Sequence, residues 1–188
     1  MIIKEFTEKN SLSLTIGKIV SSKLFGIVSF SILTAVAAQI AVPVKPVPFT
    51  LQTMFVVLAG AFLGSKNGAY SMLLYLAMAA AGLPVLANVP GTTFGILNFA
   101  GPTGGYLLAF PAAAFLTGYI VERKSNYLTT AIAMFLGEAL VILAGTSFLY
   151  TFYVRDAKLA IELGAAMFSL WTVAKVFVAA SILYKIKK

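Results

Sequence analysis

Two ionisable side chains, Glu138 and Lys175, stand inside long apolar stretches of this sequence. A charged group at the centre of a lipid bilayer costs at least about 2.5 to 3.5 kcal/mol, so it is normally accompanied by a partner or a ligand. A carboxylate and an ammonium group could pair with each other, take part in a proton-coupled cycle, or bind a polar ligand. Lys175 could also reach an interface with its long side chain. These two residues are the first candidates for a functional site.

Little other chemistry is available. The 188 residues include no cysteine and no histidine, and only six are acidic. This composition excludes disulfides, cysteine nucleophiles, imidazole bases and the usual haem, zinc and copper ligands. The phosphate-binding pattern GxxxxGK[ST] is also missing from the sequence. We therefore expect a protein that is not an enzyme, has no cofactor or metal, and relies on a partner for energy if it pumps a substrate.

The elements that must position these residues are long apolar runs, because 60% of the chain is hydrophobic and 11% is charged. A helix that crosses the hydrocarbon core, roughly 30 Å thick, needs about 20 mainly apolar residues. The runs predict six membrane-spanning helices: Leu24 to Val42, Leu51 to Leu63, Ala69 to Leu83, Tyr106 to Val121, Leu128 to Val154, and a last run ending at Ile186. The second and third runs, separated only by Gly64 to Gly68, could instead form a kinked or re-entrant pair.

The fold predicted from these runs is an all-α bundle forming a single integral membrane domain over residues 1–188. Residues 1–23 are interpreted as a cytoplasmic lead-in, although an amphipathic segment on the inner leaflet also fits them. With six spans, ten lysine and arginine residues fall on one side and three on the other. This asymmetry puts both termini in the cytoplasm. It also explains most of the net charge of +8 without nucleic-acid binding.

Two interruptions of the apolar runs fall on the predicted outer side. The segment Val42 to Gln52 contains Pro43, Pro46 and Pro48, so it should be extended rather than helical, as either a lid or a rigid connector. The segment Gly82 to Gly105 contains six glycines, three prolines and two asparagines. A loop of this length in a compact protein is usually functional, and glycine lets backbone amides approach a ligand closely.

The depth of Lys175 depends on where the last helix begins. If residues 160–186 form one helix, Lys175 lies deep in the membrane. If residues 156–168 form a separate outer segment, the helix begins near Trp171, Thr172 becomes a plausible N-cap, and Lys175 lies in the first turn. A cation beside the positive end of a helix favours an anionic ligand such as a carboxylate.

The stretch PVPFTLQTMFVVLAGAFLGSKNGAYSMLLYLAMAAAGLPVLAN, followed by GPTGGYLLAF, resembles the BioY family, the biotin-binding S components of energy-coupling factor transporters. The resemblance runs from about Leu33 to Val121 and weakens beyond it. Family members usually open the last helix with a sequence like PFxPGDLIK. This chain keeps the lysine as Lys175, but Thr172 occupies the aspartate position and both prolines are missing.

The resemblance implies a six-helix subunit of the bacterial cell membrane that captures biotin from the outer face and depends on a transmembrane coupling protein and two ATPases. It implies a pocket under the loop Val42 to Gln52. Biotin chemistry assigns the ureido ring to Asn88 or Gln52, the bicyclic body to Trp171 and Tyr106, and the carboxylate to Lys175 or the backbone near Gly91 and Thr92. Glu138 completes the substrate-binding set as a possible partner of Lys175.

Other interpretations of these residues stay open. Trp171 and Tyr106 could be interface anchors, and Asn88 could be a turn residue. Ala37 and Ala41 match an AxxxA docking pattern for the coupling protein, but pairs of small residues four apart also serve packing within a bundle. An autonomous carrier or channel for a small organic anion is the alternative function, because Glu138 and Lys175 could support proton coupling.

Overall fold

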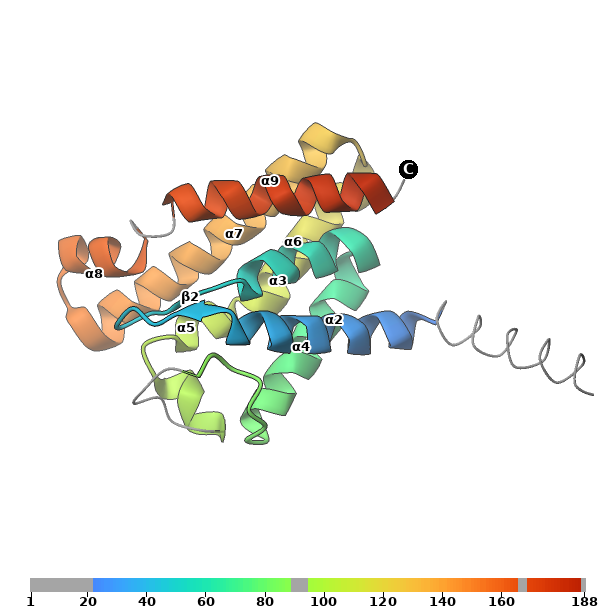
Figure 1. Cartoon of the computed structure of the whole chain (residues 1–188). Coiled ribbons are helices and arrows are strands. Elements are labelled where there is room, and N and C mark those ends of the chain that lie inside the picture. Colours follow the sequence, from blue (N-terminus) through green and yellow to red (C-terminus); the bar gives the residue numbers. More distant parts are fainter. Residues whose placement is uncertain (1–21, 89–94, 166–168, 187–188) are drawn as a thin grey trace, which may run out of the picture.

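The computed structural model describes residues 22–88, 95–165 and 169–186. Most of the predicted lead-in lies outside the described residues. Helices dominate, and their bounds follow the chain (Figure 1): α2 (Lys23–Gln39), β1 (Ala41–Val42), β2 (Phe49–Thr50), α3 (Gln52–Leu63), α4 (Ser65–Ala80), the 3₁₀ helix η1 (Gly95–Ala100), α5 (Gly104–Leu108), α6 (Phe110–Arg123), α7 (Tyr127–Leu149), the π-helical turn η2 (Tyr150–Val154), α8 (Ala157–Gly164) and α9 (Ser169–Ile186). The predicted all-α class is confirmed.

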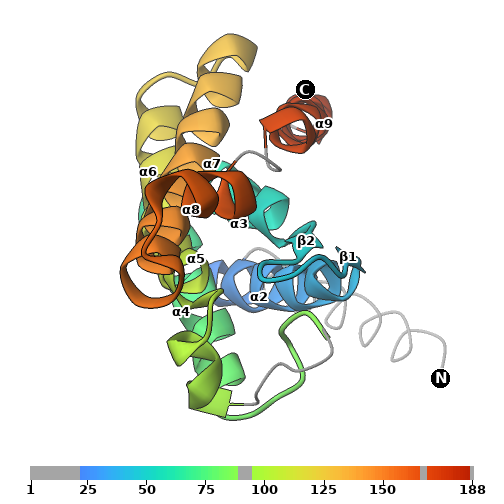
Figure 2. The same ribbon diagram turned by 90° about the vertical axis from the view of Figure 1, so that its left-hand side faces the viewer.

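The connections between the long helices lie at two opposite ends of the bundle, with short turns at one end and longer irregular segments at the other (Figure 1). One end, on the right of Figure 1, holds the start of α2, the α3–α4 and α6–α7 turns and the end of α9. We call it the basic end, after Lys23, Lys66, Arg123, Lys124 and Lys185. The opposite end, called the loop end, carries the β1–β2 hairpin, η1, η2 and α8. Figure 2 views the molecule from the left-hand side of Figure 1, with η2 and α8 toward the viewer.

The helices turn apolar side chains outward and several polar side chains inward. Ser31, Thr34, Ser71 and Thr117 are fully buried, whereas Leu24, Leu128 and Leu143 are about two-thirds exposed. The Ser31 hydroxyl lies 2.8 Å from the Ile27 carbonyl and 2.7 Å from the Ser71 carbonyl, which joins α2 to α4. Extensive exposed apolar surface of this kind is unfavourable in water and suits a lipid environment.

Two continuous helices in the described part of the chain are long and apolar enough to cross a membrane, Gly104–Arg123 and Tyr127–Val154. The first joins α5 to α6 across Ala109, two residues before Pro111, which lacks an amide donor and interrupts the helical hydrogen bonds. The second is α7 extended by the π-helical turn η2. Helices α2 and α3 are apolar but shorter.

The connection between α3 and α4 is shorter than predicted. The sequence indicated a linker from Gly64 to Gly68, but α4 begins at Ser65 and only Gly64 separates the two helices. Gly64 has a φ of 85°, a conformation that glycine adopts without steric cost. The Glu122 carboxylate accepts hydrogen bonds from the Ser65 amide (2.7 Å) and hydroxyl (2.9 Å), so α6 caps the start of α4.

The proline-rich segment is non-helical, as predicted, but it is a hairpin rather than one extended strand. β1 and β2 pair antiparallel, with Ala41 opposite Thr50 and Val42 opposite Phe49. Val47, between the strands, is buried in the same core cluster as Tyr75 and Phe110. The hairpin therefore packs onto the loop end of the bundle instead of extending away from it.

Part of the segment predicted as a long loop is also ordered by packing. Residues 95–100 form η1, and Gly104 and Gly105 open α5. A Cβ atom at Gly104 would lie 2.0 Å from the Phe99 carbonyl oxygen, and one at Gly105 would lie 2.2 Å from the Phe148 Cβ. These two glycines are explained by close packing between segments rather than by an approach to a ligand.

Candidate functional site

The two ionisable residues inside the apolar runs meet in the centre of the bundle. Glu138 on α7 and Lys175 on α9 form an ion pair, with 3.4 Å between Lys175 Nζ and Glu138 Oε1. Glu138 is 0% exposed and Lys175 is 3% exposed. The Lys175 ammonium also donates a hydrogen bond to the hydroxyl of Thr53, in the first turn of α3. Three helices thus converge on one buried polar cluster of Thr53, Glu138 and Lys175. We call it the ion-pair cluster and include the buried Thr172, which lies one turn before Lys175 on α9.

This cluster retains unused hydrogen-bonding capacity. Beyond Lys175 and the neighbouring Thr53 hydroxyl, the carboxylate oxygens of Glu138 have no hydrogen-bond partner within the described residues, and the buried Thr172 hydroxyl has none. Buried polar atoms in native proteins are nearly always satisfied, because an unpaired one costs about 1 to 3 kcal/mol. A polar ligand that presents N–H or O–H donors to Glu138 would remove this deficit.

The separate segment before the last helix agrees with the second of the two predicted placements, but Lys175 lies beyond the first turn of that helix and is buried. Helix α8 is a separate segment at the loop end, and α9 begins at Ser169, so Lys175 lies six residues, or about 9 Å, along α9. The prediction that Thr172 is an N-cap is wrong, because α9 starts three residues earlier and Thr172 lies within its first turn. The pairing of Lys175 with Glu138, left open by the sequence, is present.

The amide of Gln52 is already engaged inside the protein. Its Oε1 accepts a hydrogen bond of 2.9 Å from Thr50, and its Nε2 donates to the hydroxyl of Tyr75. Tyr75 in turn donates to the Val85 carbonyl at 3.0 Å. Both ends of the Gln52 amide are therefore hydrogen-bonded within the protein, and its assignment to the ureido ring stays a prediction. Tyr75, which the sequence analysis did not single out, links the hairpin to the segment after α4.

Tyr106 ties three elements together at the loop end. Its hydroxyl donates to the Gly164 carbonyl at the end of α8 (3.0 Å) and lies 3.4 Å from the Thr146 hydroxyl on α7. Its ring lies where a Cβ atom at Gly145 would stand, 2.2 Å from the nearest ring atoms. Because Tyr106 is 5% exposed, it is an internal packing residue and not an anchor at the membrane surface.

The other predicted binding residues are not brought together. The side chain of Asn88 is exposed in the segment after α4. Trp171 lies in the first turn of α9, and its side chain is outside the described part of the structure. Gly91 and Thr92 also lie outside the described residues. Glu138 and Lys175 are thus the predicted pair that the described structure places in direct contact, and Thr53 is the neighbour that the sequence analysis missed.

The predicted docking pair on the first helix needs correction. Helix α2 ends at Gln39, so Ala41 belongs to β1 and does not continue the helical face of Ala37. Ala37 itself is 1% exposed and Ala38 is fully buried. In this conformation Ala37 packs within the bundle, which agrees with the alternative role of such small residues in helix contact.

The fold and the buried cluster define a small helical membrane protein with one polar site enclosed among apolar helices. The BioY family model matches residues 8–188, so the chain belongs to the BioY family. It is 40% identical over 162 residues to "Biotin transporter BioY" of Thermotoga maritima, covering 85% of this chain and 92% of that protein. It is 44% identical over 128 residues to "Biotin transporter BioY" of Rhodobacter capsulatus, covering 66% of this chain and 64% of that one.

A solved structure has the same fold. The crystal structure at 2.1 Å of the S-component for biotin from an ECF-type ABC transporter superposes with a TM-score of 0.79 at 26% identity. The match covers 88% of this chain and 90% of that chain. Because the likeness extends over nearly the whole of both chains, the arrangement of helices described above is that of an S component.

Proposed function

We propose that this protein is the biotin-binding, substrate-specific subunit of an ECF-type importer. The family, the two biotin-transporter relatives and the biotin S-component structure support this function. The single observation in this chain that carries it is the ion-pair cluster, where the Glu138 carboxylate has spare acceptor capacity and the Thr172 hydroxyl has no partner among the described residues, inside an apolar bundle. That combination suits a ligand with an apolar body and a compact polar group.

The charge state of the cluster selects which end of biotin enters it. The ureido group offers two N–H donors and one carbonyl acceptor, whereas the valerate end is an anion. Lys175 is already paired with Glu138, and a second carboxylate would be repelled by the first. The ureido donors can instead bind the Glu138 oxygens while Lys175 donates to the ureido carbonyl. We therefore revise the expectation that Lys175 holds the biotin carboxylate and assign the ureido ring to this cluster.

In this proposal the loop end faces outward and the basic end faces the cytoplasm, with six spans and both termini inside. Biotin enters beneath the β1–β2 hairpin, which acts as a lid. A transmembrane coupling protein and two ATPases supply the energy for import. The chain itself binds the substrate and carries out no ATP hydrolysis.

Calorimetry on the purified chain tests the binding function. We expect stoichiometric biotin binding, no ATPase activity, and uptake into proteoliposomes only when the coupling protein and ATPases are present. Uptake driven by a pH gradient without any ATPase would contradict the proposal and identify an autonomous carrier. Absence of biotin binding by the folded chain would contradict it as well.

A comparison of biotin with biotin amide tests the assignment of the ureido ring. In the double variant Glu138→Gln/Lys175→Met, loss of charge-assisted hydrogen bonds should weaken binding by about 10- to 150-fold. Because both ligands carry the same ureido ring, both should weaken equally. If biotin amide were spared, Lys175 would hold the carboxylate, as the sequence alone indicated.

A further inference from the structure

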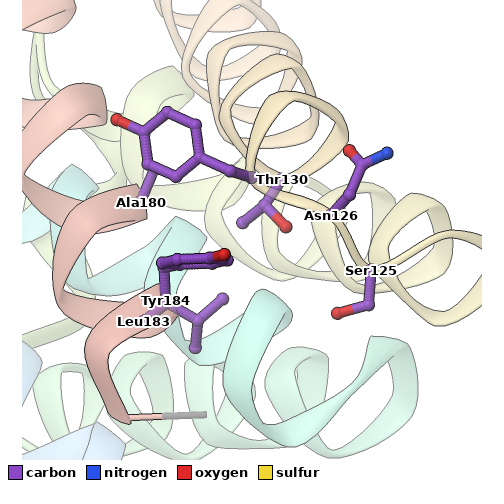
Figure 3. Close-up of a pocket in the computed structure, with 7 residues that line it drawn as sticks. Ser125, Asn126, Thr130, Ala180, Leu183 and Tyr184 are labelled. Atoms are coloured by element: carbon purple, nitrogen blue, oxygen red, sulfur yellow. The ribbon is translucent and has the colours of Figure 1, made fainter. Parts of the chain in front are cut away.

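The basic end of the molecule holds a pocket that the proposed biotin site does not use. It has a volume of about 220 Å³ and lies between the start of α7 and the last turns of α9 (Figure 3). Ser125, Asn126, Tyr127 and Thr130 form one wall, and Leu183 and Tyr184 form the other. The pocket is at the opposite end of the bundle from the hairpin and α8, so it is separate from the route proposed for biotin.

The polar wall contains Thr130, a largely buried residue, 4% exposed, whose Oγ1 makes no hydrogen bond to any described residue. Figure 3 shows Thr130 at the edge of the space between Tyr184 and Ser125, with its methyl group nearer Tyr184 and its hydroxyl on the side of Ser125 and Asn126. A hydroxyl that makes no hydrogen bond within the protein can donate to a ligand that carries an acceptor atom, and the pocket offers this donor.

The electrostatics of the pocket favour an anionic acceptor. Asn126 caps α7 by accepting a 2.7 Å hydrogen bond from the Thr129 amide, so the positive end of a 23-residue helix lies at the polar wall. Lys124 directly precedes Ser125, and Lys185 directly follows Tyr184. Both lysines are exposed, and neither forms a salt bridge with another described residue. A phosphate group would satisfy the hydroxyl and the positive charge together.

An apolar surface continues from the pocket toward the middle of the bundle. Phe177 lies two helical turns from Tyr184 on α9, and Phe135 lies two turns from Tyr127 on α7, so each pair shares a face of its helix. Phe135 is 48% exposed and Phe177 is 55% exposed. A ligand with a phosphate head can therefore extend an apolar chain along these faces.

The size of the pocket favours a lipid headgroup over a helical protein segment as the ligand. A volume of about 220 Å³ is the volume that roughly seven water molecules occupy in liquid water. An α-helix with its side chains is about 10 to 12 Å in diameter and is too wide to enter such a space. The dimensions suit a small polar headgroup.

We propose that this pocket binds the phosphate headgroup of an anionic phospholipid, with its acyl chains against Phe135 and Phe177. The Thr130 hydroxyl and the start of α7 contact the phosphate, while Lys124 and Lys185 favour a net negative headgroup over a zwitterionic one. Assignment to the inner leaflet rests on the orientation proposed above. The chemistry of the pocket does not depend on that orientation. An experiment that contradicts the orientation would therefore leave the lipid site intact, and the two proposals can be tested separately.

The purified full-length chain in a neutral detergent provides the test. Its thermal unfolding is followed during titration with short-chain phosphatidylglycerol, short-chain phosphatidylcholine or inorganic phosphate, and bound lipid is counted by native mass spectrometry. We expect saturable stabilisation by one phosphatidylglycerol, a weaker effect of phosphatidylcholine, and none from phosphate at the same concentration. Thr130→Val should weaken the phosphatidylglycerol effect about tenfold, the loss expected for one hydrogen bond.

The matched control is Thr129→Val, which makes the same chemical change at the adjacent position that does not line the pocket. Biotin binding should be unchanged in both variants, which verifies that both are folded. Equal effects of the two lipids, equal effects of the two variants, or full stabilisation by phosphate alone would overturn the lipid site. It would also be overturned if Thr130→Val left lipid binding intact but blocked assembly with the coupling protein, because the pocket would then be a protein contact.

Discussion

At the scale of single residues, the burial of Glu138 and Lys175 makes the stability effect of each depend on the other. Lys175→Met leaves the Glu138 carboxylate buried without its counter-charge, and breaking a buried ion pair in this way costs about 3 to 5 kcal/mol. Adding Glu138→Gln removes the uncompensated charge, so the double variant should recover most of the lost stability. Thermal or denaturant unfolding in detergent measures both effects.

The useful comparison is between stability and ligand binding in the same variants. The double variant should be nearly as stable as the unmodified chain but still bind biotin weakly, because the charged groups that form the hydrogen bonds to the ligand are gone. If the double variant were as unstable as Lys175→Met alone, the pair would not be coupled. If it bound biotin normally, the ion-pair cluster would be structural only.

The sequence could reveal these two residues but not their contact. A charge inside an apolar run is visible in one dimension, whereas the contact depends on the start of α9 and on the rotation of three helices about their axes. The hydrogen bonds of the Gln52 amide to Thr50 and Tyr75 could not be predicted for the same reason, because they depend on the fold. Tyr75 gave no signal, since a tyrosine among apolar residues is compatible with many positions in a membrane helix.

At the scale of elements, the close approach of α3 to α6 depends on one glycine. A Cβ atom at Gly60 would lie 2.1 Å from the Ala114 carbonyl oxygen, which is backbone and can move only with its helix. Gly60→Ala should therefore destabilise the protein by about 1 to 3 kcal/mol, the range for overpacking a tight contact. Unfolding in detergent is the measurement.

Gly26→Ala on α2 is the matched control for this prediction. There the added Cβ atom would meet only the Cδ2 atom of Leu63 at 2.7 Å, and that flexible side chain can adjust. The higher helix propensity of alanine, about 1 kcal/mol over glycine, should then make the change neutral or stabilising. Similar losses for both variants would show that the contact between α3 and α6 is not unusually tight.

The hydrogen bonds through Tyr75 should hold the two loop-end segments in place. Tyr75→Phe leaves Gln52 Nε2 and the Val85 carbonyl without this partner, which should cost about 1 to 3 kcal/mol. Hydrogen exchange should accelerate at Thr50 and in the segment around Val85, and biotin affinity should fall. Tyr70→Phe, on the exposed face of the same helix, should change stability by less than about 0.5 kcal/mol. No difference between the two variants would contradict the proposed link.

The apolar runs located the helices well, because long hydrophobic stretches leave few alternatives in a membrane. Boundaries were less accurate where packing decides them. Helix α4 begins at Ser65 because Glu122 on α6 caps it. The residues around Ser65 give no indication of this distant partner. The glycines before Tyr106 suggested a ligand loop, whereas contacts with Phe99 and Phe148 account for two of them.

At the scale of the whole molecule, the distribution of positive charge is the feature that predicts the orientation of the protein in the membrane. In the described residues, Lys23, Lys66, Arg123, Lys124 and Lys185 lie at the basic end, and Lys45, Arg155 and Lys158 lie at the loop end. The remaining five lysines of the predicted cytoplasmic side lie outside the described residues. This asymmetry could be counted from the sequence because short loops alternate between the two sides of the membrane.

The absence of cysteine from the chain permits a direct test of that direction by single substitutions. Lys158→Cys and Lys66→Cys place a thiol on exposed positions at the loop end and the basic end, respectively. Because the excess of positive charge favours the cytoplasm, a membrane-impermeant maleimide added to intact cells should label Lys158→Cys at once and Lys66→Cys only after permeabilisation. Lys45→Cys and Lys124→Cys repeat the comparison with different loops. Biotin binding by each variant verifies its fold. Labelling of the Lys66 and Lys124 variants in intact cells would show that the membrane orientation is the reverse of the one proposed. Biotin would then have to enter the proposed site from the cytoplasm.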